Sequence, residues 1–319
     1  MQCKSPCRPS TKVAIIGAGF VGSTTAYALM LDGVASEIAL IDINKNKVEG
    51  EALDLAHCMQ FTQQTTITAS DSFELVKDAA VIVISAGMAQ APHQTRTDLL
   101  EANTKLFKKI IPEIVRYNDQ AILLVVTNPL DVLTYVTWKL SGLSPCQVFG
   151  TGTVLDTARL RYLMGQYFSI SPKDITASIL GEHGDSEFVW WSRAQIAGVQ
   201  LDQLPGYSLE SLTNLYEKTK SAAYEIISKK GSTSYAIALV VCKIVKAILR
   251  DQSRAFTVST YLDHYAGVQD VFLSVPTIVR RGGICQRLEI DLDEQEQKFF
   301  KASAYKVKSE IDAAMALIQ

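Results

Sequence analysis

Four short apolar runs recur through the first half of the chain, separated by segments in which apolar residues have helical spacing. The runs are KVAIIG (12–17), EIALIDI (37–43), AVIVISAG (80–87) and AILLVVTNP (121–129). Because they are continuously apolar, they predict strands that are covered on both faces. Helices are predicted between them over 22–31, 45–60 and 99–117. This alternation is typical of a doubly wound α/β fold with a parallel sheet, which we expect to occupy residues 11–150.

The second half of the chain has a different order of elements. Apolar residues at helical spacing predict helices over 154–167, 209–229, 233–250 and 292–317. A strand-rich stretch is predicted between the last two helices, over 255–290. Helices and strands in this mixed order predict an α+β domain over 151–319. We expect MQCKSPCRPS, residues 1–10, to form an N-terminal arm outside both domains.

The length of the chain indicates how many domains it can form, and its charge and apolar runs indicate which kinds of partner to exclude. The 319-residue chain is long enough for two domains that each bury a core. Its 31 basic and 33 acidic residues nearly balance, and no basic block stands out, which argues against a nucleic-acid partner. The longest apolar runs are interrupted by Gly, Pro or Asn before the ~20 residues that a membrane span needs. We therefore expect no nucleic-acid or membrane partner.

The cysteines and the N-terminus indicate the cellular compartment. The six cysteines lack the paired spacing of a zinc site, so no metal is expected. Free thiols are typical of proteins in a reducing cytoplasm. The first ten residues lack the apolar segment of a secretory signal. The sequence therefore predicts a cytoplasmic protein.

A glycine pattern follows the first predicted strand. Gly17, Gly19 and Gly22 form GxGxxG between that strand and a helical segment, and Asp42 ends the next strand. The glycines permit a tight turn, close approach of a pyrophosphate and close packing of the helix, while the acidic residue accepts hydrogen bonds from ribose hydroxyls. A carboxylate at this position would repel a 2′-phosphate. The pattern thus predicts a Rossmann domain that binds NAD rather than NADP, with a mere turn-capping role for Asp42 as the alternative.

One histidine has a setting that suggests acid–base chemistry. His183 lies between glycines in SILGEHGDSEF, while Asp156 and Arg159 share one face of a predicted helix. An imidazolium can protonate a carbonyl oxygen, a carboxylate can orient that imidazolium, and an arginine can hold a substrate carboxylate by two parallel hydrogen bonds. This combination suits hydride transfer to a 2-keto acid. Spacing alone leaves open an ordinary ion pair between Asp156 and Arg159 on a solvated helix surface.

Several longer motifs occur together in a characteristic order. They are GAGFVGS, LID, VVTNPLDVLT, GTGTVLDTAR and GEHGDSE. From about residue 12 to near the C-terminus, the chain resembles the L-lactate and lactate-like malate dehydrogenase family. The resemblance implies a Rossmann doubly wound parallel sheet followed by an α+β substrate domain. It also implies reversible, NADH-dependent reduction of a 2-keto acid.

The resemblance assigns roles to the four charged candidates. His183 is similar to the family's proton donor and acceptor, and Asp156 to the carboxylate that pairs with it. Arg159 resembles the arginine that grips the substrate carboxylate. Arg96, in QTRTDL, resembles the arginine that polarises the reacting carbonyl from a loop that closes over the substrate. Closure of that loop would exclude water and strengthen the electrostatic effect of Arg96.

Three further residues resemble parts of the family's pocket. Asn128 in VTNP is similar to an asparagine that contributes to both the substrate and the nicotinamide site. Ile237 matches an apolar residue that packs against the nicotinamide. Thr151 lies where many relatives carry serine, and it keeps the hydroxyl group at the cofactor site.

The substrate side chain is expected to face Gln90, six residues before Arg96. Malate dehydrogenases of this type resemble one another in having arginine there, which pairs with the second carboxylate of oxaloacetate. Opposite a neutral amide, that carboxylate would be enclosed without a counter-ion, at a cost of several kcal/mol. Together with Thr233, which lactate dehydrogenases similarly carry, Gln90 favours pyruvate and L-lactate. A malate or branched 2-hydroxyacid dehydrogenase and a catalytically silent dinucleotide-binding protein stay as alternatives.

The resemblance also bears on assembly and regulation. It implies a homotetramer, to which the N-terminal arm could contribute contacts. Many bacterial relatives bind fructose 1,6-bisphosphate between subunits through an arginine and a histidine. Arg161 matches that arginine, but Thr176 stands at the histidine position. We therefore expect activation by this sugar phosphate to be weak or absent.

Overall fold

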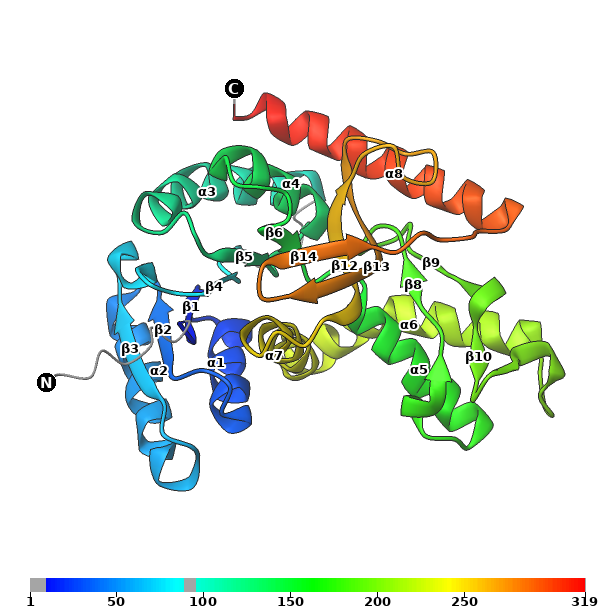
Figure 1. Cartoon of the computed structure of the whole chain (residues 1–319), viewed down its shortest axis with the longest axis horizontal. Helices are drawn as coiled ribbons and strands as arrows, with labels where there is room; N and C mark the ends of the chain where they lie inside the picture. Colours follow the sequence, from blue (N-terminus) through cyan, green and yellow to red (C-terminus); the bar gives the residue numbers. More distant parts are fainter. Residues whose placement is uncertain (1–9, 89–95, 319) are drawn as a thin grey trace, which may run out of the picture.

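The fold is built on one large sheet, which runs from β3 at the left of Figure 1 to β12, β13 and β14 near its centre. The computed structural model describes residues 10–88 and 96–318. Of Arg96 it describes the backbone and not the side chain. Within these residues the sheet has nine strands in the order β14-β13-β12-β6-β5-β4-β1-β2-β3. Its parallel part comprises β1 (Lys12–Ile16), β2 (Glu37–Ile41), β3 (Thr66–Ser70), β4 (Val81–Ile84), β5 (Ile122–Val125) and β6 (Val148–Gly150). The expected doubly wound parallel sheet is thereby confirmed.

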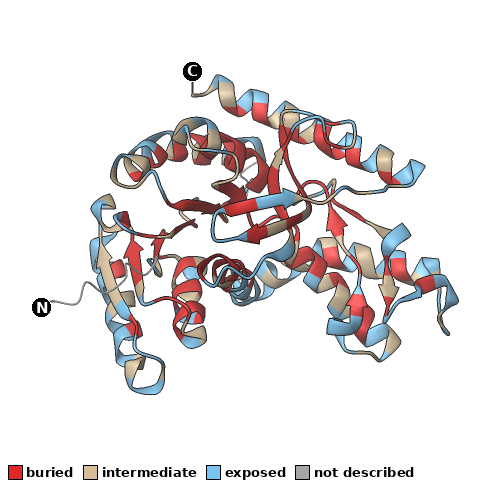
Figure 2. Ribbon diagram, in the orientation of Figure 1, coloured by how far each residue is buried: buried red, intermediate tan, exposed pale blue. Residues whose placement is uncertain are grey.

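Helices cover both faces of this sheet, as Figure 1 shows. One face is covered by α3 (Arg96–Tyr117), α4 (Leu130–Ser141) and α8 (Glu294–Ala316), and the other by α1 (Phe20–Asp32), α2 (Lys45–His57) and α7 (Tyr235–Leu249). Successive strand residues point to opposite faces. Accordingly, Ala14 and Ile16 of β1 belong to the first core, and Val13 and Ile15 to the second. This two-sided burial, drawn in red in Figure 2, explains why the strand sequences are continuously apolar.

The strand-rich stretch of the second half joins the same sheet. It forms β12 (Arg254–Leu262), β13 (Val271–Arg280) and β14 (Gly283–Arg287), an antiparallel extension attached where Ser259 pairs with Gly150. The expected mixture of helices and strands is confirmed. The sequence did not predict that these strands continue the first sheet, because edge pairing leaves no periodic signal in the sequence.

A smaller core lies beside the sheet, toward the right of Figure 1. It is formed by α5 (Val154–Phe168), α6 (Leu209–Lys230) and short strands. The short strands are β7 (Ile175–Thr176), β8 (Ile179–Leu180), β9 (Phe188–Val189), β10 (Gln195–Ile196) and β11 (Val199–Gln200). The loop between β8 and β9 carries His183 and places it between this smaller core and the large sheet.

The helix predicted over 45–60 is shorter in the structure. It ends as an α-helix at His57, because residues Cys58–Phe61 form a tighter 3-10 turn. Over the described parts of the chain, none of the helices combines the length and the apolar character that crossing a membrane would need.

Candidate active site

The glycine turn after β1 has the shape that the sequence predicts. Gly17 has a φ of +98°, and a Cβ there would lie 2.7 Å from the Ala86 nitrogen. A Cβ on Gly22 would lie 1.9 Å from the Gly17 carbonyl oxygen, so α1 packs directly on the turn. At Gly19, in contrast, a Cβ would have no described atom within 4 Å. The turn therefore leaves open space at the N-terminus of α1, which fits a bound pyrophosphate.

Asp42 follows β2 and fixes the same turn. Its Oδ2 accepts a hydrogen bond from the backbone nitrogen of Ala18 at 2.7 Å, and its Oδ1 accepts one from Asn44 at 2.9 Å. The structural role left open by the sequence is therefore present. The carboxylate is still half-exposed, and each oxygen has a further lone pair for a ribose hydroxyl. Recognition of the ribose by Asp42 stays a prediction.

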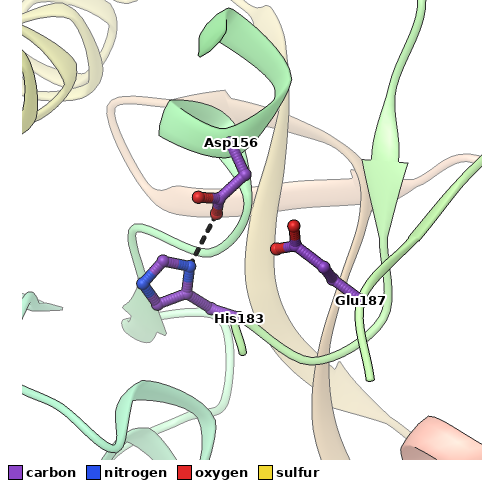
Figure 3. A group of neighbouring side chains, drawn as sticks. All are labelled: Asp156, His183 and Glu187. Carbon is purple, nitrogen blue, oxygen red and sulfur yellow. Dashed lines mark hydrogen bonds and ion pairs between the residues drawn. The ribbon is translucent and has the colours of Figure 1, made fainter. Parts of the chain in front are cut away.

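The structure brings His183, Asp156 and Arg159 together. His183 Nδ1 lies 2.6 Å from Asp156 Oδ2, and the other carboxylate oxygen lies 3.0 Å from an Arg159 guanidinium nitrogen (Figure 3). The side chains of Asp156 and Arg159 are only 5% and 14% exposed. The alternative of a solvated surface ion pair therefore does not describe this contact. With Nδ1 held by Asp156, Nε2 is the ring nitrogen that can exchange a proton with a substrate.

Charges around the imidazole favour its protonated form. Burial by itself would lower the pKa of His183, but the negative charge and hydrogen bond of Asp156 outweigh it, with smaller contributions from Glu187 and Asp131, and raise the pKa to about 9. Burial would raise the pKa of Asp156, yet the positive charges of His183 and Arg159 hold it below its usual value. At neutral pH the pair is therefore an imidazolium and a carboxylate.

Glu187 is a third titratable group beside this pair. It is 6% exposed, and its carboxyl points toward Asp156 and His183 in Figure 3, with the facing ligand atoms of all three within 4.8 Å of one another. Burial and the nearby charge of Asp156 raise its pKa. This spacing could admit a cation, but Arg159 already neutralises Asp156. We interpret the cluster as an acid–base site, and the absence of a metal stays a prediction.

The base of the predicted lid is tied to the turn that carries Asn128. Asn103, fully buried on α3, accepts a hydrogen bond from the Met88 nitrogen and donates one to the Asn128 carbonyl oxygen, both at 2.8 Å. Asn128 itself is exposed in the turn between β5 and α4. Sequence reasoning missed Asn103, since an amide within a helix has no distinguishing signal. Gln90 lies outside the described residues, and the backbone of Arg96 begins α3.

The other predicted pocket residues lie on separate elements. Thr151, 3% exposed, follows β6, and its nitrogen donates a hydrogen bond to the Val125 carbonyl oxygen at 3.0 Å. It thus lies at the carboxyl edge of the parallel strands, where the glycine turn and Asp42 also lie. Thr233 precedes α7 and Ile237 lies in its first turn, and both are half-buried. Their predicted roles toward the substrate and the nicotinamide stay predictions.

The two residues that concern sugar-phosphate activation lie near each other. Arg161, on α5, donates a hydrogen bond from Nε to the carbonyl oxygen of Ala177 at 2.8 Å. Ala177 directly follows Thr176, which is exposed at the end of β7. The threonine hydroxyl brings no positive charge to this surface, and weak or absent activation stays a prediction.

Comparisons with known proteins agree with this geometry. The family model described as lactate/malate dehydrogenase, NAD binding domain, matches residues 11–150, and the model for the alpha/beta C-terminal domain of the same family matches 153–318. An L-lactate dehydrogenase of Clostridium botulinum is 47% identical over 315 residues, which cover 97% of this chain and 99% of the relative. L-lactate dehydrogenase 1 of Clostridium acetobutylicum is 44% identical over 311 residues, covering 96% and 99%.

Solved structures give the same assignment. A lactate dehydrogenase from a Medee basin deep-sea metagenome library matches with a TM-score of 0.93 and 38% identity, covering 96% of this chain and 99% of its own. The minor L-lactate dehydrogenase of Enterococcus mundtii matches with the same score, identity and coverage. Both structures therefore share the fold across nearly the whole length. On the glycine turn, the contact between half-buried His183 and buried Asp156, and these full-length matches, the chain belongs to the lactate/malate dehydrogenase family, whose N-terminal domain binds NAD.

Proposed function

We propose that this chain catalyses the reversible, NADH-dependent reduction of pyruvate to L-lactate, the activity of an L-lactate dehydrogenase. The observation that carries the proposal is the contact of half-buried His183 with the buried carboxylate of Asp156, with Arg159 on the other oxygen of the same carboxylate. In a family of NAD-dependent dehydrogenases, this arrangement combines a proton donor with a charged group for a substrate carboxylate.

The open glycine turn and Asp42 are the groups that would hold the cofactor. Gly19 leaves room for the pyrophosphate at the start of α1, and the carboxylate of Asp42 would accept the ribose hydroxyls. Asn128, Thr151 and Ile237 would complete the site toward the nicotinamide. When bound, NADH supplies the hydride that adds to the carbonyl carbon of the substrate.

The chain itself supplies the proton and the orientation. His183 donates a proton from Nε2 to the carbonyl oxygen, while Asp156 holds the imidazolium through Nδ1. Arg159 binds the substrate carboxylate by two parallel hydrogen bonds, and Arg96 polarises the carbonyl when the loop closes. In lactate oxidation the same steps run backward, and neutral His183 accepts the proton.

Substrate choice is proposed to depend on Gln90 and Thr233. A second substrate carboxylate opposite the neutral amide of Gln90 would be enclosed without a positive partner. Pyruvate has only a methyl group at that position and avoids this penalty. The runner-up, a malate or branched 2-hydroxyacid dehydrogenase, requires another cation or a larger pocket at the same place.

The direct test of the proposed activity uses the purified full chain with NADH and pyruvate. We expect NADH consumption that depends on both the protein and pyruvate, with L-lactate as the product. NADH binding without turnover of any 2-keto acid would instead support the catalytically silent alternative.

The pH profile of the reaction should follow the titration of His183. Because its pKa is raised to about 9, the protonated form required for reduction is present at neutral pH and is lost as the pH rises through that value. kcat/KM for pyruvate should therefore be level near neutrality and fall above about pH 9, while lactate oxidation should rise to a plateau there. Replacing Asp156 with asparagine should move both transitions to lower pH. If the pH transitions of the Asp156→Asn variant stayed at their wild-type values, the assignment of these transitions to His183 would be contradicted.

We further propose that the chain has two domains and forms a homotetramer in the cytoplasm. The family models that match 11–150 and 153–318 support a nucleotide-binding domain over 11–150 and a substrate-binding domain over 151–319. A homotetramer in the cytoplasm follows from the family resemblance. Sedimentation of the purified chain tests the assembly, since a stable monomer would contradict it.

A further inference from the structure

We propose that Asp131 is a positioning residue that fixes the main chain of His183 to the turn carrying Asn128. The inference rests on the proposed function, in which His183 must meet a substrate held beside that turn. Asp131 lies in the first turn of α4, within the motif VVTNPLDVLT, and only three residues after Asn128. It touches neither the imidazole ring nor a substrate in this account, and acts through the backbone alone.

Both oxygens of the Asp131 carboxyl group have buried partners. Oδ2 accepts a hydrogen bond from the backbone nitrogen of His183 at 2.7 Å, and Oδ1 accepts one from the Ser259 hydroxyl at 2.6 Å. Asp131 is 3% exposed, and Ser259 on β12 is fully buried. A charged residue in an otherwise buried stretch of helix requires such partners, because an unpaired carboxyl group there would be strongly destabilising.

The hydrogen bond to His183 is one of three that hold consecutive residues. The backbone nitrogens of residues 181, 182 and 183 each donate to a different element, at 3.0, 2.7 and 2.7 Å. Their acceptors are the Ser274 carbonyl on β13, the Ser303 hydroxyl on α8 and the Asp131 carboxyl on α4. The segment before the imidazole is thus fixed from three directions. Of the three acceptors, only Asp131 belongs to the first half of the chain.

The position of Asp131 links the placement of His183 to the turn that carries Asn128. Asn128 and Asp131 flank the same helix start, and 52 positions separate Asp131 from His183 in the chain. The hydrogen bond therefore sets the place of the proton donor relative to the predicted substrate and nicotinamide pocket. A misplacement of reacting groups by about 1 Å can lower a rate by on the order of 10²-fold.

The charge state of Asp131 is secondary to its position. Burial and, less strongly, the Glu182 charge raise its pKa to about 7, against the hydrogen bonds from Ser259 and His183. A carboxyl oxygen of Asp131 can accept the hydrogen bond from the His183 backbone N–H whether the carboxyl group is protonated or ionised. The other charged groups near this cluster are Asp156, Arg159, Glu187 and Lys306, which pairs with Glu182.

Two substitutions separate position from charge. In Asp131→Asn, Oδ1 can still accept the His183 N–H while the amide donates to Ser259, so kcat should stay within about threefold of wild type. In Asp131→Glu, the charge is kept but the carboxylate is displaced by one methylene, so kcat should fall by about 10- to 100-fold. Neither change should alter the NADH Kd by more than about threefold, because Asp131 lies outside the predicted cofactor contacts.

Hydrogen exchange of the peptide spanning residues 180–186 provides a readout that does not depend on turnover. Exchange should rise in Asp131→Glu and stay near wild type in Asp131→Asn, because only the former loses the bond to the His183 nitrogen. The matched control is Asp270. Its carboxylate accepts a hydrogen bond from Tyr135, which lies on α4 as Asp131 does. Asp270→Asn and Asp270→Glu should leave both kcat and this exchange unchanged.

Several outcomes would overturn the inference. Wild-type kcat and exchange in Asp131→Glu would show that the position of the carboxyl group does not matter. Equal loss in Asp131→Asn and Asp131→Glu would indicate charge or folding instead of positioning. The wild type is measured first with pyruvate, and a wild type without turnover would contradict the proposed function while the exchange experiment still decided the role of Asp131.

Discussion

Replacing His183 with alanine is expected to lower kcat for pyruvate reduction by about 10²- to 10⁴-fold, the range that a positioned acid–base group contributes. The reason is that, among the residues proposed for the site, His183 alone is assigned to donate a proton to the carbonyl oxygen. NADH affinity should be nearly unchanged, since the glycine turn and Asp42 lie on other elements. Steady-state kinetics give kcat, and a fluorescence titration of NADH gives the affinity.

A surface histidine provides the control for this substitution. The side chain of His264 is 81% exposed, and alanine at that position should leave both kcat and NADH binding at wild-type values. Full activity of the His183→Ala variant would exclude His183 as the proton donor and, with it, the proposed mechanism. Lost activity together with lost NADH binding would indicate a general structural defect.

Replacing Arg159 with leucine should lower kcat/KM for pyruvate by about 10²- to 10³-fold, because removal of one partner from a buried charge pair costs about 2–5 kcal/mol. Much of this loss is expected in KM, since Arg159 is proposed to hold the carboxylate of the bound substrate. Arg159→Lys keeps a positive charge beside Asp156 but loses the second parallel hydrogen bond, so its loss should be about tenfold. Initial rates over a range of pyruvate concentrations measure both variants.

The control for Arg159 is Arg193, which pairs with Asp291 at the surface and is 53% exposed. Arg193→Lys should leave the kinetics of pyruvate reduction unchanged. A leucine variant of Arg159 with wild-type KM would show that the substrate carboxylate is bound elsewhere. An equal loss in the leucine and lysine variants would mean that the forked geometry, and not the charge, carries the whole effect.

Strands of the sheet were predictable where both faces are buried. The runs at β1, β2, β4 and β5 are continuously apolar because each residue meets one of the two cores. The edge strand β3, with the sequence TITAS, is largely half-exposed and therefore lacks that signal. The three-residue β6 is too short to produce one.

Helix α4 was not predicted because, unlike the half-exposed strand β3, it is buried on all sides over much of its length. Residues 130–137 of α4 are all buried, so its apolar residues do not form a single stripe with helical spacing. A helix surrounded by protein lacks the amphipathic pattern on which such a prediction depends. Residues 130–141 therefore received no predicted element, and the preceding run was ended at Pro129.

The candidate site was predictable where its residues are close in sequence. Asp156 and Arg159 are three apart on α5, and their shared face is a consequence of helix geometry. The contact between Asp156 and His183 was suggested by their residue types, but spacing could not show it, and the family resemblance gave the specific pairing. The bond from His183 to Asp131 joins distant segments, and the burial of Glu187 depends on the folded chain, so spacing predicted neither.

The proposed choice of pyruvate is tested most directly by comparing kcat/KM for pyruvate and for oxaloacetate with NADH, with a branched 2-keto acid in the same series. We expect a preference for pyruvate of about a hundredfold or more, because Gln90 offers no counter-ion to a second carboxylate. A preference for oxaloacetate would contradict the assigned substrate and would mean that another cation fills that place. A preference for the branched acid would contradict the predicted size of the pocket.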